Sequence, residues 1–274
     1  MRDLRQQPSE GQGGRRAAAS DPFDAADAVS GSDLFLSPHA DDICFSLGAL
    51  AFRRRAGTLL TVFSSSSYIA PAQRWRITHP EETTQIRQAE DAAFASSCGL
   101  AMRTFGLDDA MARGRDVFDL SAAEEDTSWL EEHLVPTLFD LAGETAEDIA
   151  RPWLFCPAGI GGHIDHVILR SVVARNIEPL MRRWRVCFYE DIFYAAEPMA
   201  RFSGLHRLTQ ALPGYGLARR SCVLAELTAR KLDLIGLYES QFDTLPKNIG
   251  DFTPATGSSD APHEAVWVAR KSGP

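Results

Sequence analysis

Short apolar runs alternate with longer stretches of helical spacing along most of this 274-residue chain. The first run covers residues 34–36 and ends at Ser37-Pro38, and the stretch from Asp41 to Arg55 then places apolar residues about once per helical turn. Gly57 follows and is predicted to end this helix. Because strands that alternate with helices build βαβ units, the sequence predicts an α/β fold, a doubly wound and mostly parallel sheet whose ligands bind beyond the carboxyl ends of the strands.

The same alternation continues towards the end of the chain. Ser121-x-x-Glu124 has the pattern of a capping box and predicts the start of one helix, in which Pro136 predicts a kink. The strands that we expect span residues 34–36, 59–63, 102–105, 153–156, 186–189 and 265–269. The other helices that we expect span residues 41–55, 82–98, 165–176 and 224–240.

Residues 1–30 differ in composition from the rest of the chain. They are rich in Gln, Gly, Ala, Ser and Arg, and Phe23 is their only aromatic residue. Such a segment cannot bury enough apolar area to offset its ordering entropy. We therefore predict a disordered or loosely attached tail over residues 1–30 and a single domain over residues 31–274, which is long enough to bury a sizeable core.

Charge and composition argue against several classes of partner. The chain carries 28 Lys and Arg against 37 Asp and Glu, a net charge of −9, which disfavours nucleic acid and anionic membranes. No apolar run approaches the ~20 residues that a membrane span needs. The five cysteines form no C-x-x-C pair, and the N-terminus lacks the apolar core of a secretory signal. We therefore expect free thiols and a cytoplasmic location.

Two segments that follow predicted strands carry chemically versatile side chains. Residues 37–42 read Ser-Pro-His-Ala-Asp-Asp and follow the first strand, and residues 161–166 read Gly-Gly-His-Ile-Asp-His and follow the strand at 153–156. Each segment holds a pair three residues apart, which can share one face of the first turn of a helix. Carboxyl ends of parallel strands meet at one edge of a sheet, so we expect the two segments to lie together.

This set of His and Asp side chains suits a catalytic metal centre. Three ligands with an open fourth position are typical of catalytic Zn²⁺, and nitrogen and carboxylate donors without thiolate also admit Fe²⁺ or another divalent ion. Each residue alone has an ordinary explanation, because a single His is more often packed or hydrogen-bonded, and Asp41 and Asp42 could simply favour the helix dipole. The placement of both motifs at strand ends favours the metal site.

The motifs Pro-His-x-Asp-Asp and His-x-Asp-His, in this order, resemble the paired signatures of the PIG-L/LmbE-like zinc-dependent N-acetylglucosaminyl deacetylases. The resemblance covers residues 33 to about 245 and implies a Rossmann-like fold. The sequence departs from the family pattern at Ala40, where a proline is frequent, and at Ile43, where an acidic residue is frequent. Neither position is a metal ligand in the family.

The resemblance also implies a role for individual residues. It makes Asp41 the general base, and it makes His163 the residue that stabilises the oxyanion and protonates the leaving amine. Asp165 would hold His163 in orientation, and Arg87 would grip sugar hydroxyls. The implied ligands of one Zn²⁺ ion are His39, Asp42 and His166.

The function that these observations favour is hydrolysis of the N-acetyl group of an amino sugar in a small glycoconjugate. We expect a secondary-metabolite intermediate, such as an aminoglycoside or a glycosylated antibiotic. Three alternatives stay open: a deacetylase of an acetylglucosaminyl-inositol thiol precursor, a sugar-binding protein without catalysis, and a metal phosphoesterase, which would usually need a second metal. A homo-oligomer is compatible with the sequence.

Several further residues are weaker candidates. Glu190 and Asp191 follow a predicted strand and could support the metal ligands from behind. Ser64–Ser67, Tyr68 and Trp75 lie in a loop and could line a sugar pocket, with ordinary loop composition as the alternative.

Overall fold

The structure is a computed structural model that describes residues 21–24, 33–77, 79, 81–143, 151–243 and 261–273. Within these residues a seven-stranded sheet has the order β3-β2-β1-β4-β5-β7-β6. The first five strands of this order are parallel, and β7 runs antiparallel to both β5 and β6. The strands are β1 (Leu34–Ser37), β2 (Thr58–Thr61), β3 (Ala101–Thr104), β4 (Trp153–Pro157), β5 (Arg185–Tyr189), β6 (Tyr215–Val223) and β7 (His263–Lys271).

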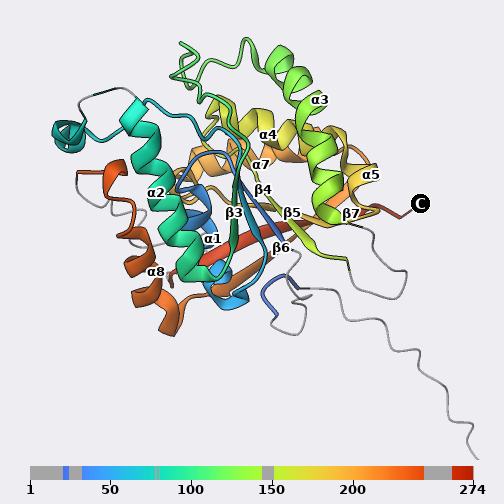
Figure 1. The fold of residues 1–274 in the computed structure, drawn as a ribbon. Helices are drawn as coiled ribbons and strands as arrows, with labels where there is room; N and C mark the ends of the chain where they lie inside the picture. Colours follow the sequence, from blue (N-terminus) through green and yellow to red (C-terminus); the bar gives the residue numbers. More distant parts are fainter. Residues whose placement is uncertain are drawn as a thin grey trace, which may run out of the picture.

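Helices cover both faces of this sheet (Figure 1). One face packs against α1 (Asp42–Arg54), α2 (Glu81–Cys98) and α8 (Thr228–Ile235), and the other packs against α3 (Ala123–Ala142), α4 (Ile164–Arg175) and α7 (Pro198–Ala211). The short elements are η2 (Pro71–Arg76), α5 (Ile177–Leu180), α6 (Ile192–Ala195), η3 (Ala225–Leu227) and η4 (Glu239–Gln241). Among the described residues, none of these helices is both long and apolar enough to cross a membrane.

The sheet lies between two apolar cores, and its central strands are therefore buried on both faces. All four residues of β1 and all five of β4 are buried. Leu34 and Leu36 face the core under α3 and α4, whereas Phe35 faces the core under α1 and stacks on Phe155 with ring centroids 4.7 Å apart. Continuous apolar runs of this kind are expected in strands covered on both faces. The predicted doubly wound α/β class is therefore confirmed.

The strand order fixes where a ligand site can lie. From β1 the chain first moves outwards to β2 and β3 and then returns to the other side of β1 to form β4. The loops after β1 and β4 therefore diverge at the point where the order reverses, which leaves a crevice at the carboxyl ends of these two strands. Residues 37–42 run from the end of β1 through this loop to the first residue of α1, and residues 161–166 run from the end of the other loop into the first turn of α4.

Several details differ from the sequence predictions. Helix α1 ends at Arg54, and the residue that caps it in the left-handed conformation is Arg55, whose φ is 50°, and not Gly57. Gly57 is needed for another reason: a Cβ there would lie 2.6 Å from the Asp33 carbonyl oxygen. The Ser121 hydroxyl bonds Asp119, so the predicted capping box does not form, and α3 continues through Pro136 to Ala142.

The last third of the chain holds the largest differences. The predicted helix at residues 224–240 is divided into η3, α8 and η4, and the sequence did not predict α7 or β6. Most of the predicted tail at residues 1–30 lies outside the described residues. Of the part that is described, Phe23 is buried against the core under α1.

Candidate metal centre

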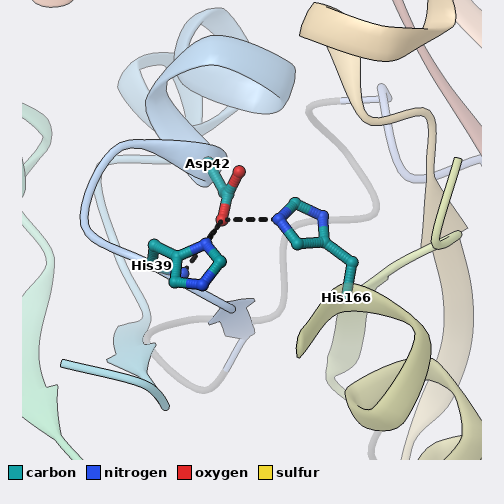
Figure 2. Close-up of side chains that lie close together, drawn as sticks. All are labelled: His39, Asp42 and His166. Carbon is teal, nitrogen blue, oxygen red and sulfur yellow. Dashed lines mark hydrogen bonds and ion pairs between the residues drawn. The ribbon is translucent and has the colours of Figure 1, made fainter. Parts of the chain in front are cut away.

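The two motif loops bring three side chains into one cluster (Figure 2). Asp42 begins α1, His39 lies in the loop before it, and His166 lies in the first turn of α4. The Asp42 Oδ2 atom lies 3.3 Å from His39 Nδ1 and 3.3 Å from His166 Nε2. The same oxygen accepts the backbone N–H of His39 at 2.9 Å, which fixes the loop against the start of the helix.

The cluster has the spacing of a tetrahedral metal site. One candidate ligand atom from each of these three residues lies within 4.8 Å of the other two. Two ligands of a tetrahedral zinc ion stand about 3.3 Å apart when each bond is about 2.05 Å long. The donor set of two imidazoles and one carboxylate, with a cavity on its open side, thus fits one divalent ion.

A carboxylate behind each imidazole holds its ring in place. His39 Nε2 lies 2.9 Å from Asp165 Oδ2, and His166 Nδ1 lies 2.7 Å from Asp191 Oδ1. Each ring therefore turns one nitrogen towards Asp42 and the other towards a buried carboxylate. Metal-binding histidines usually have such an outer partner, which fixes the tautomer and raises the basicity of the ligand nitrogen.

The structure corrects the partner that was predicted for Asp165. Its carboxylate contacts His39, the Ala110 N–H at 2.9 Å and Arg113 at 2.6 Å, and not the His163 side chain. Only the Asp165 backbone N–H reaches His163, whose Nδ1 accepts it at 3.3 Å. The His39 loop lies opposite Asp165, and the hydrogen bonds of the Asp165 carboxylate go to His39, Ala110 and Arg113, although one ring nitrogen of His163 lies within 4.8 Å of a carboxylate oxygen of Asp165. A second possible metal group of His39, His163 and Asp165 is disfavoured, because Arg113 and Ala110 already occupy the Asp165 carboxylate.

Of the two weaker acidic candidates, Asp191 is the one that lies behind the cluster. Glu190 points the other way, into a buried network with Arg201 at 2.7 Å, Arg219 at 2.9 Å and the Trp267 indole at 2.9 Å. Neighbouring residues of an extended segment face opposite directions, which explains why two adjacent carboxylates have different surroundings.

His163 lines the cavity beside the cluster. Burial, together with the neighbouring His39 and His166 side chains, lowers the pKa of His163 to about 2, so its ring is neutral. Since Nδ1 accepts the Asp165 N–H, the proton of the neutral ring is placed on Nε2. His163 is therefore a hydrogen-bond donor through Nε2.

Asp41 has an unusual backbone and a buried carboxylate. Its φ of 132° lies in a region that residues other than glycine rarely occupy, and such strain is concentrated at functional sites. Burial, reinforced by the charge of Asp42, raises the pKa of the Asp41 carboxyl above its usual range. The carboxylate lies 3.2 Å from Arg87, which also donates to the Ala40 carbonyl at 2.8 Å and to the Ser66 hydroxyl at 2.6 Å.

A cavity of about 570 Å³ opens above these residues, within the range of roughly 300–1,000 Å³ that is typical of ligand pockets. Tyr68 lines this cavity as the sequence suggested, whereas Ser66 lies behind Arg87 and donates to Asp109. The side chain of Trp75 lies outside the described part of the structure. The sequence reasoning missed several parts of the cavity wall. One part lies in residues 106–120, a polar loop without any periodic signal, and its lining residues are Asp109, Ala110, Met111 and Val117. Other parts that were missed include Phe193, Tyr194 and Phe242.

A doubly wound fold with a His/Asp cluster at its switch point defines a Rossmann-like protein with a candidate metal centre. The model of the PIG-L family, described as GlcNAc-PI de-N-acetylase, matches residues 34–177, and the chain belongs to this family. The match includes both motif loops.

Individual proteins were also found to be similar. The 2'-N-acetylparomamine deacetylase of Streptomyces fradiae is 34% identical over 172 residues, which are 61% of this chain and 59% of that protein. Among solved structures, the A40926 pseudoaglycone deacetylase Dbv21 has a TM-score of 0.63 at 22% identity and covers 90% of this chain and 100% of its own. A teicoplanin deacetylase in complex with teicoplanin has a TM-score of 0.64 at 19% identity over 88% of this chain and 99% of its own. These two structures show that the fold is shared.

Proposed function

We propose that this protein is a metal-dependent hydrolase that removes the N-acetyl group from an amino sugar of a secondary-metabolite intermediate. The observation that carries the proposal is the cluster of His39, Asp42 and His166 at one end of a cavity, with a further carboxylate, Asp41, next to it. A protein that only bound the sugar would have no use for this additional base.

The residues that would hold the ion are His39, Asp42 and His166, with Asp165 and Asp191 keeping the two rings in position. We propose Zn²⁺, and the same donors also suit Fe²⁺ or another divalent ion. When bound, the ion would act as a Lewis acid that polarises the acetyl carbonyl and lowers the pKa of water.

The neighbouring side chains would carry the proton transfers and hold the reacting groups. Hydrolysis of an amide requires attack of water at the carbonyl carbon and a proton for the departing nitrogen. Asp41 would accept the proton of the attacking water, since its raised pKa makes it a stronger base than an ordinary carboxylate. It would then deliver this proton to the nitrogen as the C–N bond breaks. His163 would donate a hydrogen bond from Nε2 to the carbonyl oxygen as negative charge develops there.

This assignment changes one part of the role that was expected for His163. A ring that stays neutral because of burial is a good hydrogen-bond donor but a poor source of a full proton. We therefore assign the protonation of the leaving amine to Asp41 and the stabilisation of the oxyanion to His163.

The relative with the highest identity given above supports the class of substrate. The name of the Streptomyces fradiae protein gives 2'-N-acetylparomamine as its substrate, and the match reaches 34% identity. We propose that the substrate that binds in the cavity is a small N-acetylated amino sugar of this kind. Arg87, predicted to grip sugar hydroxyls, lines the cavity and keeps its Nε–H without a protein partner among the described residues.

Absence of nucleic-acid and membrane partners stays a prediction, as does the cytoplasmic location, which the five free cysteines support.

The proposal is tested by acetate release from a panel of N-acetylated glycosides, including aminoglycoside intermediates and an acetylglucosaminyl-inositol, with and without chelator. We expect chelator-sensitive release that is fastest with an aminoglycoside. Binding of these sugars without any acetate release would instead identify a sugar-binding protein. Activity confined to phosphate esters would identify a phosphoesterase, and preference for the inositol conjugate would overturn the proposed substrate.

A further inference from the structure

Gly161 and Gly162, which precede His163 in the second motif, have no role in the reaction proposed above. Both adopt positive φ, 90° at Gly161 and 80° at Gly162. A Cβ at Gly161 would lie 2.2 Å from Cγ and 2.4 Å from Cδ1 of Tyr194, whereas a Cβ at Gly162 would meet nothing closer than Arg207 Nη2 at 3.6 Å. The absence of a side chain at position 161 therefore allows the Tyr194 ring to lie directly on the backbone there.

This contact places the Tyr194 ring beside the metal cluster. Tyr194 lies in α6, three residues after Asp191, and its ring stands edge-on to His166 with centroids 6.1 Å apart. Phe118 contacts the ring from another direction, at a centroid distance of 6.5 Å and an angle of 89°. Gly161, His166 and Phe118 thus hold the ring in one orientation.

Tyr194 also lines the cavity, and its side chain is only partly buried. The Cβ–Cγ end of the side chain lies against Gly161, and the hydroxyl is not among the fully buried polar atoms without a partner in the described part of the chain. Among the described residues, this hydroxyl has no hydrogen-bond partner. By contrast, the buried hydroxyls of Tyr189 and Tyr238 bond the Leu36 carbonyl at 3.0 Å and Asp91 at 2.7 Å. Tyrosines in protein interiors usually satisfy the hydroxyl in this way, so the Tyr194 hydroxyl is available for a ligand.

We propose that Tyr194 is a specificity residue that hydrogen-bonds the sugar hydroxyl on the ring carbon next to the acetamido carbon. This inference rests on the proposed function. The acetamido group must reach Asp41 and the metal cluster, and the ring carbon that bears it is then held near His166, which Tyr194 flanks. In a glycoside, one neighbour of this carbon carries the glycosidic bond, which leaves the hydroxyl on the other neighbour. A phenol and an alcohol can each donate and accept, and an ordinary tyrosine stays protonated below a pH of about 10.

The test compares Tyr194→Phe with the wild-type protein on two substrates, an N-acetylglucosaminide and its 3-deoxy analogue. The wild-type protein should favour the hydroxylated substrate by about tenfold in kcat/KM, the usual size of one hydrogen bond to a substrate hydroxyl. Tyr194→Phe should lose this preference, with a KM raised about tenfold and a kcat that changes less than about threefold. Tyr215→Phe, in β6, is a control that removes a hydroxyl outside the cavity. A variant that still discriminates between the two substrates, or one that loses kcat alone, would overturn the proposal.

A second pair of variants tests whether the position of the Tyr194 ring depends on its contact with Gly161. Gly161→Ala and Gly162→Ala both strain a positive-φ position, but only the substitution at position 161 collides with Tyr194. We expect Gly161→Ala to lose the preference for the 3-hydroxyl and Gly162→Ala to retain it. If these two variants discriminated equally between the hydroxylated and the 3-deoxy substrate, the proposed dependence of Tyr194 on its contact with Gly161 would be contradicted.

A binding measurement separates this proposal from the proposed function. Calorimetry with the Asp41→Asn protein, with and without Tyr194→Phe, reports sugar affinity under conditions of strongly reduced turnover. About tenfold weaker binding of the hydroxylated sugar, with no change for the deoxy sugar, would support the role of Tyr194 even if the wild-type protein released no acetate. Equal affinities in the two backgrounds would overturn it even if acetate release were rapid.

Discussion

Replacement of Asp41 by Asn tests whether Asp41 is the general base while its chemically identical neighbour, Asp42, is a metal ligand. The Asp41 carboxylate lies outside the cluster formed by His39, Asp42 and His166 and contacts Arg87 at 3.2 Å. Asn keeps the shape of the side chain but cannot accept a proton. We therefore expect metal affinity to be retained and kcat to fall by about 10²–10⁴-fold, the usual contribution of a positioned general base.

The structure also indicates that this variant folds. Arg87 keeps its hydrogen bonds to the Ala40 carbonyl at 2.8 Å and to Ser66 at 2.6 Å when the charge of Asp41 is removed. Loss of that charge also relieves its repulsion with Asp42, a contribution that raises the pKa of Asp41 in the wild-type protein. The thermal midpoint of Asp41→Asn should therefore stay close to that of the wild-type protein.

The pH dependence gives an independent check. A base acts only when it is deprotonated, and burial raises the pKa of Asp41. The wild-type kcat/KM should therefore increase with pH through this raised pKa and be lower on the acid side. The residual activity of Asp41→Asn should lack that rise, because Asn does not titrate.

The matched control is Asp42→Asn, which removes a charged ligand. Its activity should recover in part when metal is added in excess, whereas the rate of Asp41→Asn should not respond to added metal. Both variants are assayed by steady-state acetate release at a series of metal concentrations. If metal-saturated Asp41→Asn turned over at the wild-type rate, the assignment of the base would be refuted.

Two further predictions concern residues behind the site and in the core. Asp191→Asn removes the carboxylate that holds His166 at 2.7 Å, so metal affinity, measured by competition with a chromogenic chelator, should fall by about 10–100-fold; unchanged affinity would show that Asp191 does not orient the ligand. Glu264 accepts the N–H groups of Ala49 and Leu50 at 2.9 Å each, just after the non-helical turn at Leu47, and pairs with buried Lys231 at 2.6 Å. Glu264→Ala should therefore lower the free energy of unfolding by about 3–5 kcal/mol in denaturant titrations, and a loss below about 1 kcal/mol would contradict this account.

The sequence was sufficient to predict the parallel part of the sheet and β7, together with the meeting of the two motif segments, but not β6. Apolar runs mark β1, β2, β4 and β5, whereas the edge strand β3 is more polar and largely exposed, and the βα alternation requires the carboxyl ends of these parallel strands to lie at one edge. It could not identify the partner of Asp165, because the spacing within α4 relates Asp165 to His163 and says nothing of His39, 126 residues earlier in the chain.

Other features depend on tertiary contacts that no local pattern reports. Gly161 is required in part because Tyr194 packs on it, and Gly57 in part because the Asp33 carbonyl approaches it, in addition to the positive φ of both residues. The helix predicted at residues 224–240 has a suitable composition, yet α8 ends at Ile235 and the backbone leaves the helical conformation at Tyr238, which is fully buried and bonds Asp91. The cavity wall at residues 106–120 is irregular, and irregular loops carry no periodic signal.

The central claim is that one divalent ion at His39, Asp42 and His166 makes this protein a deacetylase. It is tested most directly by titrating metal-free protein with Zn²⁺ and with Fe²⁺ while measuring both acetate release and circular dichroism. The account predicts a folded, inactive metal-free protein, because a core of this size does not depend on an ion, and activity that saturates at one equivalent of metal. It also predicts that His166→Ala neither binds the ion nor gains activity. Acetate release from the metal-free protein, or full activity of His166→Ala, would contradict it.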